Sequence, residues 1–313
     1  MIRRKNRVSI ALFVIAALVQ LSVAQSIVYV SAQQQEYESP TWLKTVTITM
    51  PAEWYMRPFA PGWIGLCSGP GSLIEDPLAI RLMNGTFVPR LASSWEWNPE
   101  TGDFTAHLRR GVIWHDGVTE YQSEDVLSAI TGYNMYYYPQ RWMSGVVDRI
   151  STPDEYTVVF HVVRPTVGFE TDILSGWSGF GLGSFWMRNG PLYKFSNETV
   201  RKWVAENNTE EITKLRDQYL ELKIREPELA LGTGPFRFTR ITDEVIIVEK
   251  WSEHYLADNN KFKGVIYYVT KTIDVSNMMF LSGEICYETA MVGEVLKTIK
   301  TKPELTLRTG ASE

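Results

Sequence analysis

The stretch VPRLASSWEWNPETGDFTAHLRRGVIWHDGVTEYQSEDV, residues 88–126, contains three local signals that indicate a mixed α/β fold. Residues 103–109 alternate between apolar and polar side chains, with the two-residue period of a half-buried strand. Asp116-Gly117 is typical of a turn. Ser123 can accept a hydrogen bond from the free amides at the start of a helix, and the two acidic residues that follow suit the positive end of its dipole. The stretch therefore predicts a strand, a turn and a helix in that order.

Strand signals outnumber helix signals along the rest of the chain. Alternation and turn residues predict strands at 45–50, 146–150, 156–163, 236–240, 245–250, 264–271 and 305–308. Turn-forming residues separate the second strand from the third and the fourth from the fifth, so each pair is expected to form a hairpin. An apolar stripe at helical spacing predicts a helix at 209–222 with Thr209 as N-cap. Further helices are expected at 198–206 and at 275–281, the last ending at Gly283. Because strands and helices do not alternate strictly, we expect a mixed sheet.

The N-terminus has the pattern of a secretory leader. Basic residues at positions 3, 4, 5 and 7 precede an apolar run at 10–19, which is shorter than the roughly 20 residues needed to span a bilayer. Ala24 and Ala32 each end a small-x-Ala cleavage site, so residues 1–32 are assigned to the leader. An uncleaved N-terminal anchor is the alternative. Either way, we expect the globular part outside the cytoplasmic membrane, in the periplasm or at the cell surface.

The charge balance argues against a nucleic-acid partner. The formal charge is −5, and removing residues 1–24 takes away four positive charges, which brings it to −9. A phosphate-binding surface needs clustered Lys and Arg, and no such cluster occurs after the leader.

The chain has two cysteines, Cys67 and Cys286. Two are too few for a disulfide framework, and their spacing does not fit a metal knuckle. A single bridge and two unpaired thiols both remain open.

Three stretches carry a resemblance to a known family. Residues 88–126 match, in order, a Pro-x-Leu-Ala-x-x-Trp opening, a strand that ends in Leu-Arg, a Trp-His-Asp-Gly turn and an Asp-Val helix start. Residues 232–236 read GTGPF, and residues 280–285 read FLSGEI, although Cys286 follows where an Asp is usual. With these motifs the chain resembles the extracellular solute-binding proteins of peptide, nickel and oligosaccharide ABC importers, family 5 of the bacterial and archaeal solute-binding proteins.

The resemblance implies an α/β, periplasmic-binding-protein-like bilobed fold, of which this chain would be a fragment that holds the first lobe and lacks the second. Residues 41–71 and 167–308 would form the ligand-facing part of that lobe. Residues 72–166 would form a smaller outer subdomain. The resemblance also implies a receptor that captures peptides and delivers them to ABC permease subunits in the membrane, with no cofactor. Oligosaccharides are the alternative ligand.

The same resemblance places ligand contacts on the loop after the first strand and on aromatic residues of neighbouring loops. In this chain these are Glu53, Trp54 and Tyr55, then Trp142 and Trp177. Aromatic rings with a polar tip give a large contact area at a small entropic cost. Packing in the core is the alternative role for each aromatic residue, and Glu53 could bind a ligand amino group or face water.

No catalytic residue or metal ligand is expected, so we do not expect an enzyme. His115 and Asp116 could be imagined as an acid–base pair, but adjacent residues on a turn point apart, and a surface turn is the preferred interpretation. The four histidines have no metal-like spacing. A secreted carbohydrate-active hydrolase is the alternative from another class, and it would require two carboxylates that converge in one cleft.

Overall fold

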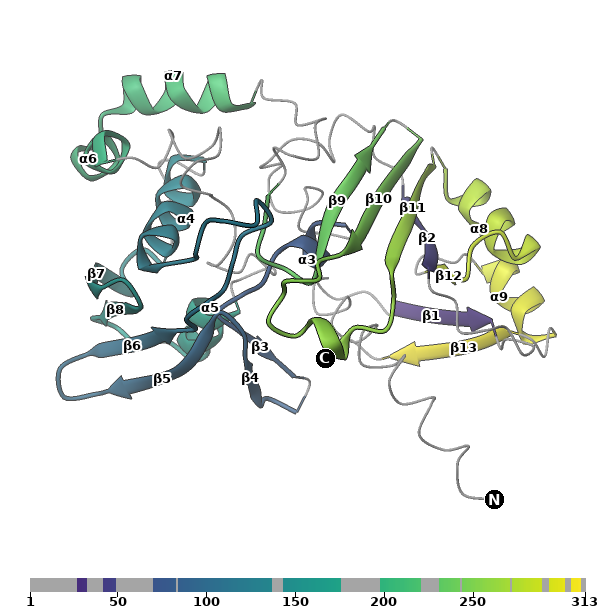
Figure 1. The fold of residues 1–313 in the computed structure, drawn as a ribbon, viewed down its shortest axis with the longest axis horizontal. Helices are drawn as coiled ribbons and strands as arrows, with labels where there is room; N and C mark the ends of the chain where they lie inside the picture. The colour runs from purple at the N-terminus through teal and green to yellow at the C-terminus, as the bar shows by residue number, and fades with distance from the viewer. Residues whose placement is uncertain are drawn as a thin grey trace.

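The computed structural model describes residues 27–32, 42–48, 70–82, 84–136, 143–175, 198–220, 231–242, 244–270, 272–288, 293–301 and 305–310. Within these ranges the chain forms a seven-stranded sheet, a four-stranded sheet and a two-stranded ribbon. Along the chain, β1 and β2 belong to the seven-stranded sheet, β3 to β8 lie outside it, and β9 returns the chain to it. Figure 1 shows the two larger sheets next to each other, with helices at both ends of the molecule.

The seven-stranded sheet is mixed, as the sequence predicts. Its strand order is β13-β1-β12-β2-β11-β10-β9. β2 runs parallel to both of its neighbours, β11 and β12, and the other pairs are antiparallel. Its strands are β1 (Ile27–Ala32), β2 (Trp42–Ile48), β9 (Phe236–Ile241), β10 (Val245–Lys250), β11 (Gly264–Thr270), β12 (Tyr287–Glu288) and β13 (Leu305–Gly310).

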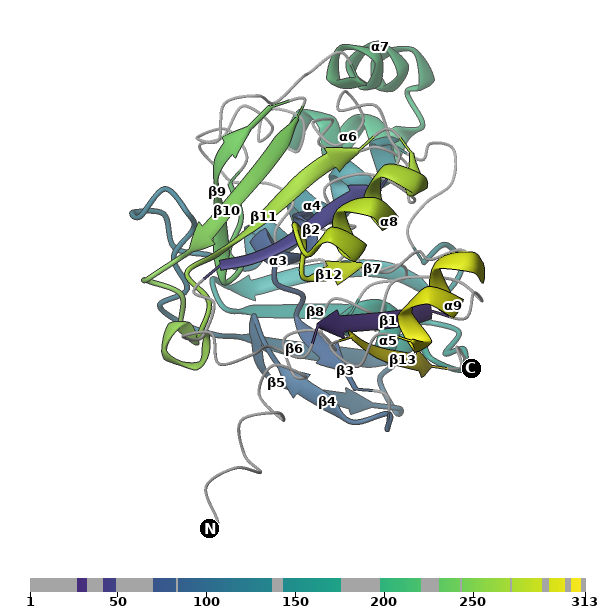
Figure 2. The same cartoon turned by 90° about the vertical axis from the view of Figure 1, so that its right-hand side faces the viewer.

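The four-stranded sheet is antiparallel, with the order β5-β6-β8-β7, and the ribbon β3–β4 lies beside it (Figure 2). One hydrophobic core cluster covers these strands, and its largest fully buried side chains are Trp114, Tyr121, Phe104 and Phe160. The strands are β3 (Ala79–Arg81), β4 (Phe87–Pro89), β5 (Ala92–Asn98), β6 (Asp103–Leu108), β7 (Val147–Asp154) and β8 (Thr157–Val162).

The helices cover opposite ends of the molecule (Figure 1). α4 contacts β7 and β8 and is in turn contacted by α6 and α7, whereas α8 contacts β2, β11 and β12. No helix among the described ranges is long and apolar enough to cross a membrane. The helices are α3 (Gly71–Ile74), α4 (Ser123–Tyr136), α5 (Phe169–Leu174), α6 (Glu198–Glu206), α7 (Thr209–Leu220), the 3₁₀ turn η4 (Ala257–Asn259), α8 (Ile273–Ser282) and α9 (Gly293–Lys300).

Both predicted hairpins are confirmed, as β7–β8 and β9–β10. The predicted end of α8 is also confirmed, because Gly283 takes a left-handed conformation with φ of 80° and its N–H bonds back to the last turn. β5 was not predicted, because its first half does not alternate: Ser93 and Ser94 are both exposed, and only Trp95 to Asn98 follow a two-residue period. Its pairing with β6 places it in the sheet despite that weak signal.

Ser123 does not cap α4 as the sequence predicts. Its hydroxyl donates to the carbonyl oxygen of Asp154 at 2.8 Å. The carboxylate of Asp125 instead accepts from the backbone N–H of Gln122 at 2.7 Å, which is one half of a capping box. The prediction was wrong because β7 ends beside the start of the helix, and Ser123 therefore ties α4 to the β7–β8 hairpin.

β1 lies within the residues assigned to the leader. Ile27–Ala32 pairs with β13 along its whole length and with β12 at two positions. Of the two predicted cleavage sites, only the one at Ala24 leaves this strand in the sheet.

Candidate functional site

The candidate site lies at the carboxyl ends of the parallel strands β2 and β11, an edge that we call the carboxyl edge and define by Ile48 and Thr270. These two residues are register partners at the ends of their strands. In open α/β sheets, ligands bind outside the carboxyl ends of the strands. α8 begins three residues after Thr270, so its first turns also lie at this edge (Figure 2).

The five predicted ligand contacts, Glu53, Trp54, Tyr55, Trp142 and Trp177, all lie outside the described residues. The sequence does bound the distance of the first of them, because Glu53 follows Ile48 by five residues. A chain of that length reaches at most about 17 Å. The prediction that these residues contact ligand remains a prediction.

Two of the motifs that carry the resemblance meet at the opposite end of the sheet, where β9 starts level with the amino ends of β2 and β11. The ring of His115 lies between two glycines: its Nδ1 accepts from the N–H of Gly232 at 3.1 Å, and its Nε2 lies 2.9 Å from the carbonyl oxygen of Gly234. The backbone N–H of His115 also donates to the carbonyl oxygen of Gly232 at 2.9 Å. An imidazole that accepts at Nδ1 must donate at Nε2 when it is neutral, so these bonds select one tautomer. We call this contact the His115 clasp.

The end of α3 leaves no room for a side chain on Gly234. A Cβ on Gly234 would lie 2.5 Å from the carbonyl carbon of Ile74 and 2.6 Å from the nitrogen of Glu75. The N–H of Gly234 donates to the carbonyl oxygen of Ile74 at 2.8 Å. The loop before β9 is therefore packed directly against the end of α3.

The predicted surface turn is wrong for His115, which is only 6% exposed. Burial lowers the pKa of His115 to about 4, so the ring is neutral at neutral pH. The side chain of Asp116 points elsewhere, since its carboxylate accepts from the N–H groups of Val118 and Thr119. As expected from their adjacency on a turn, the two residues do not form an acid–base pair.

A second buried polar group lies beside the clasp. The carboxylate of Asp76 accepts from Nε2 of His254 at 2.8 Å and from the hydroxyl of Tyr255 at 2.6 Å. The N–H of Leu256 donates to Nδ1 of His254, which again fixes the tautomer. Burial and the Asp76 carboxylate raise the pKa of Tyr255, so its hydroxyl stays protonated as a donor. This group links the chain after β10 to the chain after α3.

Glu75 is the buried acid next to this group. The residue is partly exposed as a whole, but its carboxyl group is buried, and this burial raises its pKa to about 8. At neutral pH the carboxyl group is therefore mostly protonated. It can donate a hydrogen bond but does not supply a negative charge.

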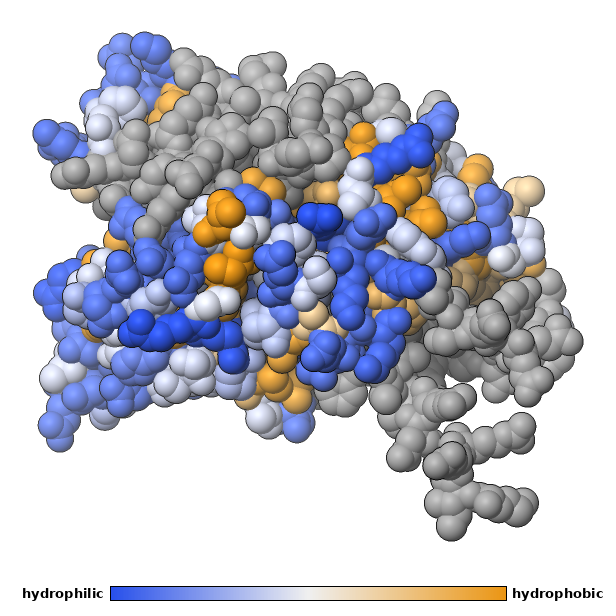
Figure 3. Space-filling model, viewed as in Figure 1, coloured by the Kyte–Doolittle hydropathy of each residue, from blue (hydrophilic) through white to orange (hydrophobic). Residues whose placement is uncertain are grey.

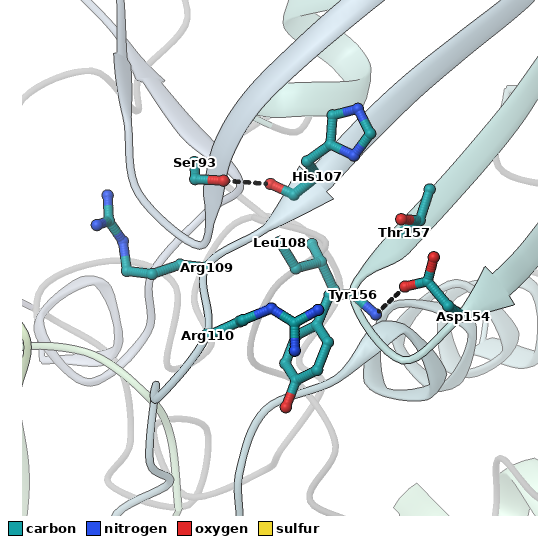
Figure 4. Close-up of a pocket in the computed structure, with 8 residues that line it drawn as sticks. All are labelled: Ser93, His107, Leu108, Arg109, Arg110, Asp154, Tyr156 and Thr157. Carbon is teal, nitrogen blue, oxygen red and sulfur yellow. Dashed lines mark hydrogen bonds between the residues drawn. The ribbon is translucent and has the colours of Figure 1, made fainter.

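A shallow surface hollow of about 410 Å³ lies on the four-stranded sheet, away from the carboxyl edge (Figure 4). Its charged groups already have contacts within the chain: the guanidinium of Arg110 stacks on the ring of Tyr156 at 4.0 Å, and Asp154 accepts from the N–H of Tyr156. The surface in this region is largely hydrophilic with scattered apolar residues (Figure 3). Within the described ranges, no group of three or more His, Cys, Asp or Glu residues could hold a metal ion.

Sequence reasoning missed the buried partners at this junction. Asp76 and His254 are 178 residues apart, and an aspartate between Glu75 and Pro77 carries no signal that it will meet a distant histidine. Cys286 is a free thiol whose sulfur donates to the carbonyl oxygen of Lys44 at 3.1 Å, and Cys67 lies outside the described residues.

Comparisons with known proteins give a family and a fold. The profile of the family described as "Bacterial extracellular solute-binding proteins, family 5 Middle" matches residues 86–312. A dipeptide-binding protein of Escherichia coli K12 is 26% identical over 104 residues, which cover 28% of this chain and 19% of that protein.

Two solved structures have the same fold. The periplasmic binding protein DppA of Helicobacter pylori, in complex with the peptide STSA, matches with a TM-score of 0.57 and 20% identity, and covers 84% of this chain and 48% of its own. The binding protein MoaA of A. tumefaciens R10, in complex with mannopinic acid, matches with a TM-score of 0.59 and 18% identity, and covers 85% and 48%. The chain thus spans about half the length of these structures, and they share its α/β mixed-sheet fold.

Replacing Gly234 by Ala should destabilise the protein by about 2–4 kcal/mol, because the new Cβ overlaps backbone atoms that cannot move independently. Urea unfolding measures the change. Gly111→Ala is the control: nothing lies within 4 Å of its Cβ, and its φ of 72° costs about 1–2 kcal/mol. If Gly234→Ala cost no more than the control, the close packing of the glycine loop would be refuted.

The stability supplied by the His115 clasp should depend on pH. The folded pKa of about 4 lies below the ordinary value of 6.5, so the unfolded chain binds more protons between these values. The contribution is complete above pH 6.5 and is lost as the pH falls toward 4, with a maximum of about 3 kcal/mol. Unfolding free energies of the wild type and His115→Gln at several pH values test this. Subtracting the two profiles removes the contribution of the other titrating groups to the unfolding free energy. Parallel profiles would contradict the prediction.

Proposed function

Because the chain belongs to the bacterial extracellular solute-binding proteins of family 5, we propose that it captures peptides outside the cytoplasmic membrane and delivers them to the permease of an ABC importer. The observation that carries the choice of peptide is the likeness to peptide-binding proteins: the curated relative is a dipeptide-binding protein, and the H. pylori structure holds the peptide STSA. A secretory leader within residues 1–32 would bring the protein to that compartment.

The architecture supports a receptor rather than an enzyme. Two of the buried polar groups of the junction have structural roles: His115 holds two glycines, and Asp76 holds His254 and Tyr255. A general acid or base needs a pKa near the working pH and access to substrate. The neutral, enclosed ring of His115 fulfils neither condition.

We also propose the division of the lobe that the resemblance implies. Residues 72–166 would form the outer subdomain, and residues 41–71 and 167–308 the ligand-facing part. The distribution of strands supports this division, because β3 to β8 lie outside the seven-stranded sheet, whereas β2 and β9 to β13 belong to it. The carboxyl edge belongs to the second part, and Glu53, Trp54, Tyr55, Trp142 and Trp177 would complete the site there.

Isothermal titration calorimetry with tetra-alanine and with maltotetraose tests the proposed function. We expect the wild type to bind the peptide and not the sugar. Trp54→Ala should weaken peptide binding at least about tenfold, or about 1.4 kcal/mol, since it removes a large contact surface. Trp95→Ala is the matched control, because Trp95 packs against Phe87 beside the four-stranded sheet.

Three outcomes would contradict the proposal. Binding of maltotetraose alone would favour the oligosaccharide receptor. Equal weakening by Trp54→Ala and by Trp95→Ala would remove Trp54 from the site. Hydrolysis of either probe, abolished by one carboxylate substitution, would favour a hydrolase.

A further inference from the structure

α8 buries polar side chains that have no hydrogen-bond partner. Ser276 is fully buried and Asn277 is 3% exposed, and neither the hydroxyl of the one nor the two polar atoms of the other has a partner. The hydroxyl of Thr270, at the end of β11, is likewise unpartnered in a residue 5% exposed. Buried polar groups are normally hydrogen-bonded, so each exception needs an explanation.

These three side chains share one location. Tyr268 packs against the cluster of Phe280, and Thr270 lies two residues further along β11, on the same face of the sheet. Ser276 and Asn277 precede Phe280 by four and three residues, so they continue its sheet-facing side by one turn toward the start of α8. That turn lies at the carboxyl edge (Figure 1).

Two other buried threonines show that the sheet and the helices can satisfy such groups internally. The hydroxyl of Thr45 in β2 donates to the carbonyl oxygen of Tyr287 at 3.0 Å, and that of Thr131 in α4 donates to Leu127 at 2.8 Å. Asn277 differs from other amide side chains in the described ranges, because both its oxygen and its nitrogen are buried without a partner. A side-chain amide at the carboxyl edge with both polar atoms unpartnered is suited to hydrogen-bond a ligand.

We propose that Thr270, Ser276 and Asn277 form a polar subsite that binds an uncharged peptide unit of the ligand, directly or through one ordered water. This inference rests on the proposed function. A peptide unit offers one donor and one acceptor, and the side-chain amide of Asn277 can match both at once. The two hydroxyls can each donate and accept beside it. None of the three carries a charge, and Asp274, the acidic residue in the first turn of α8, is exposed. The subsite is therefore built for the ligand backbone rather than for its charged ends.

Calorimetry of the 313-residue protein with tetra-alanine, and with N-acetyl-tetra-alanine amide, whose ends are uncharged, tests the subsite. Asn277→Leu keeps the shape of the side chain and should weaken both peptides at least about tenfold, and Ser276→Ala should weaken them about threefold. The matched control is Ser128→Ala, which removes another fully buried, unpartnered hydroxyl from α4, and it should leave affinity unchanged. Titration of the same variants with maltotetraose tests whether the three side chains bind a sugar instead.

The thermal midpoint without ligand is the second readout. Replacing a buried, unpartnered amide by an apolar group of the same shape is nearly neutral or stabilising, so the midpoint of Asn277→Leu should equal or exceed that of the wild type. A fall of more than about 5 °C would mean that Asn277 has a structural partner, and it would overturn the subsite.

The outcomes separate this inference from the proposed function. If the wild type binds peptide and Asn277→Leu binds it equally well, the subsite is wrong and the peptide receptor stands. A loss confined to the peptide with charged ends would place the subsite at a terminus, and a loss confined to maltotetraose would assign it to sugar hydroxyls; both overturn the inference. Failure of the wild type to bind either peptide would overturn the receptor and the subsite together.

Discussion

The His115 clasp is the contact on which the arrangement of the two sheets depends. His115 lies between β6 and α4, whereas Gly232 and Gly234 precede β9, which returns the chain to the seven-stranded sheet. One neutral imidazole accepts from one glycine and donates to the other, so both bonds require the same ring orientation and tautomer. Burial lowers the pKa of the ring, so His115 is neutral at neutral pH, and only the neutral ring can accept from the N–H of Gly232 at Nδ1.

The clasp is supported by the second polar group behind it. The rings of His115 and Trp251 meet edge-on at 5.5 Å, and the chain then turns to place His254 and Tyr255 on Asp76. Asp76 lies between α3 and β3, where the chain passes from one sheet region to the other. Each crossing between the sheets is thus held by a buried histidine with both ring nitrogens in use. Hydrophobic packing alone would not specify that relative orientation.

Local signals in the sequence predicted the local parts of the fold. The β7–β8 and β9–β10 hairpins and the Gly283 end of α8 follow from turn chemistry over a few residues, and they are confirmed. Long-range contacts were not predictable in the same way. The buried state of His115 depends on a loop 117 residues away, and the hydroxyl of Ser123 is drawn to the end of a strand 31 residues later. In both cases a tertiary partner outcompeted the local one.

The same contrast between local signals and long-range contacts applies to the candidate site. The sequence could nominate the loop after β2 because a strand end is a local signal, but Ser276 and Asn277 read as two ordinary polar residues in an apolar helix. Only the sheet-facing position of Phe280, three and four residues later, shows that they are buried. The rings of His115 and His254 are hydrogen-bonded within the chain. The polar side chains at the carboxyl edge, Thr270, Ser276 and Asn277, instead have buried atoms without a partner. A receptor benefits from this contrast, because a satisfied junction fixes the sheet at its other end, while the unsatisfied groups at the carboxyl edge gain the most when ligand binds.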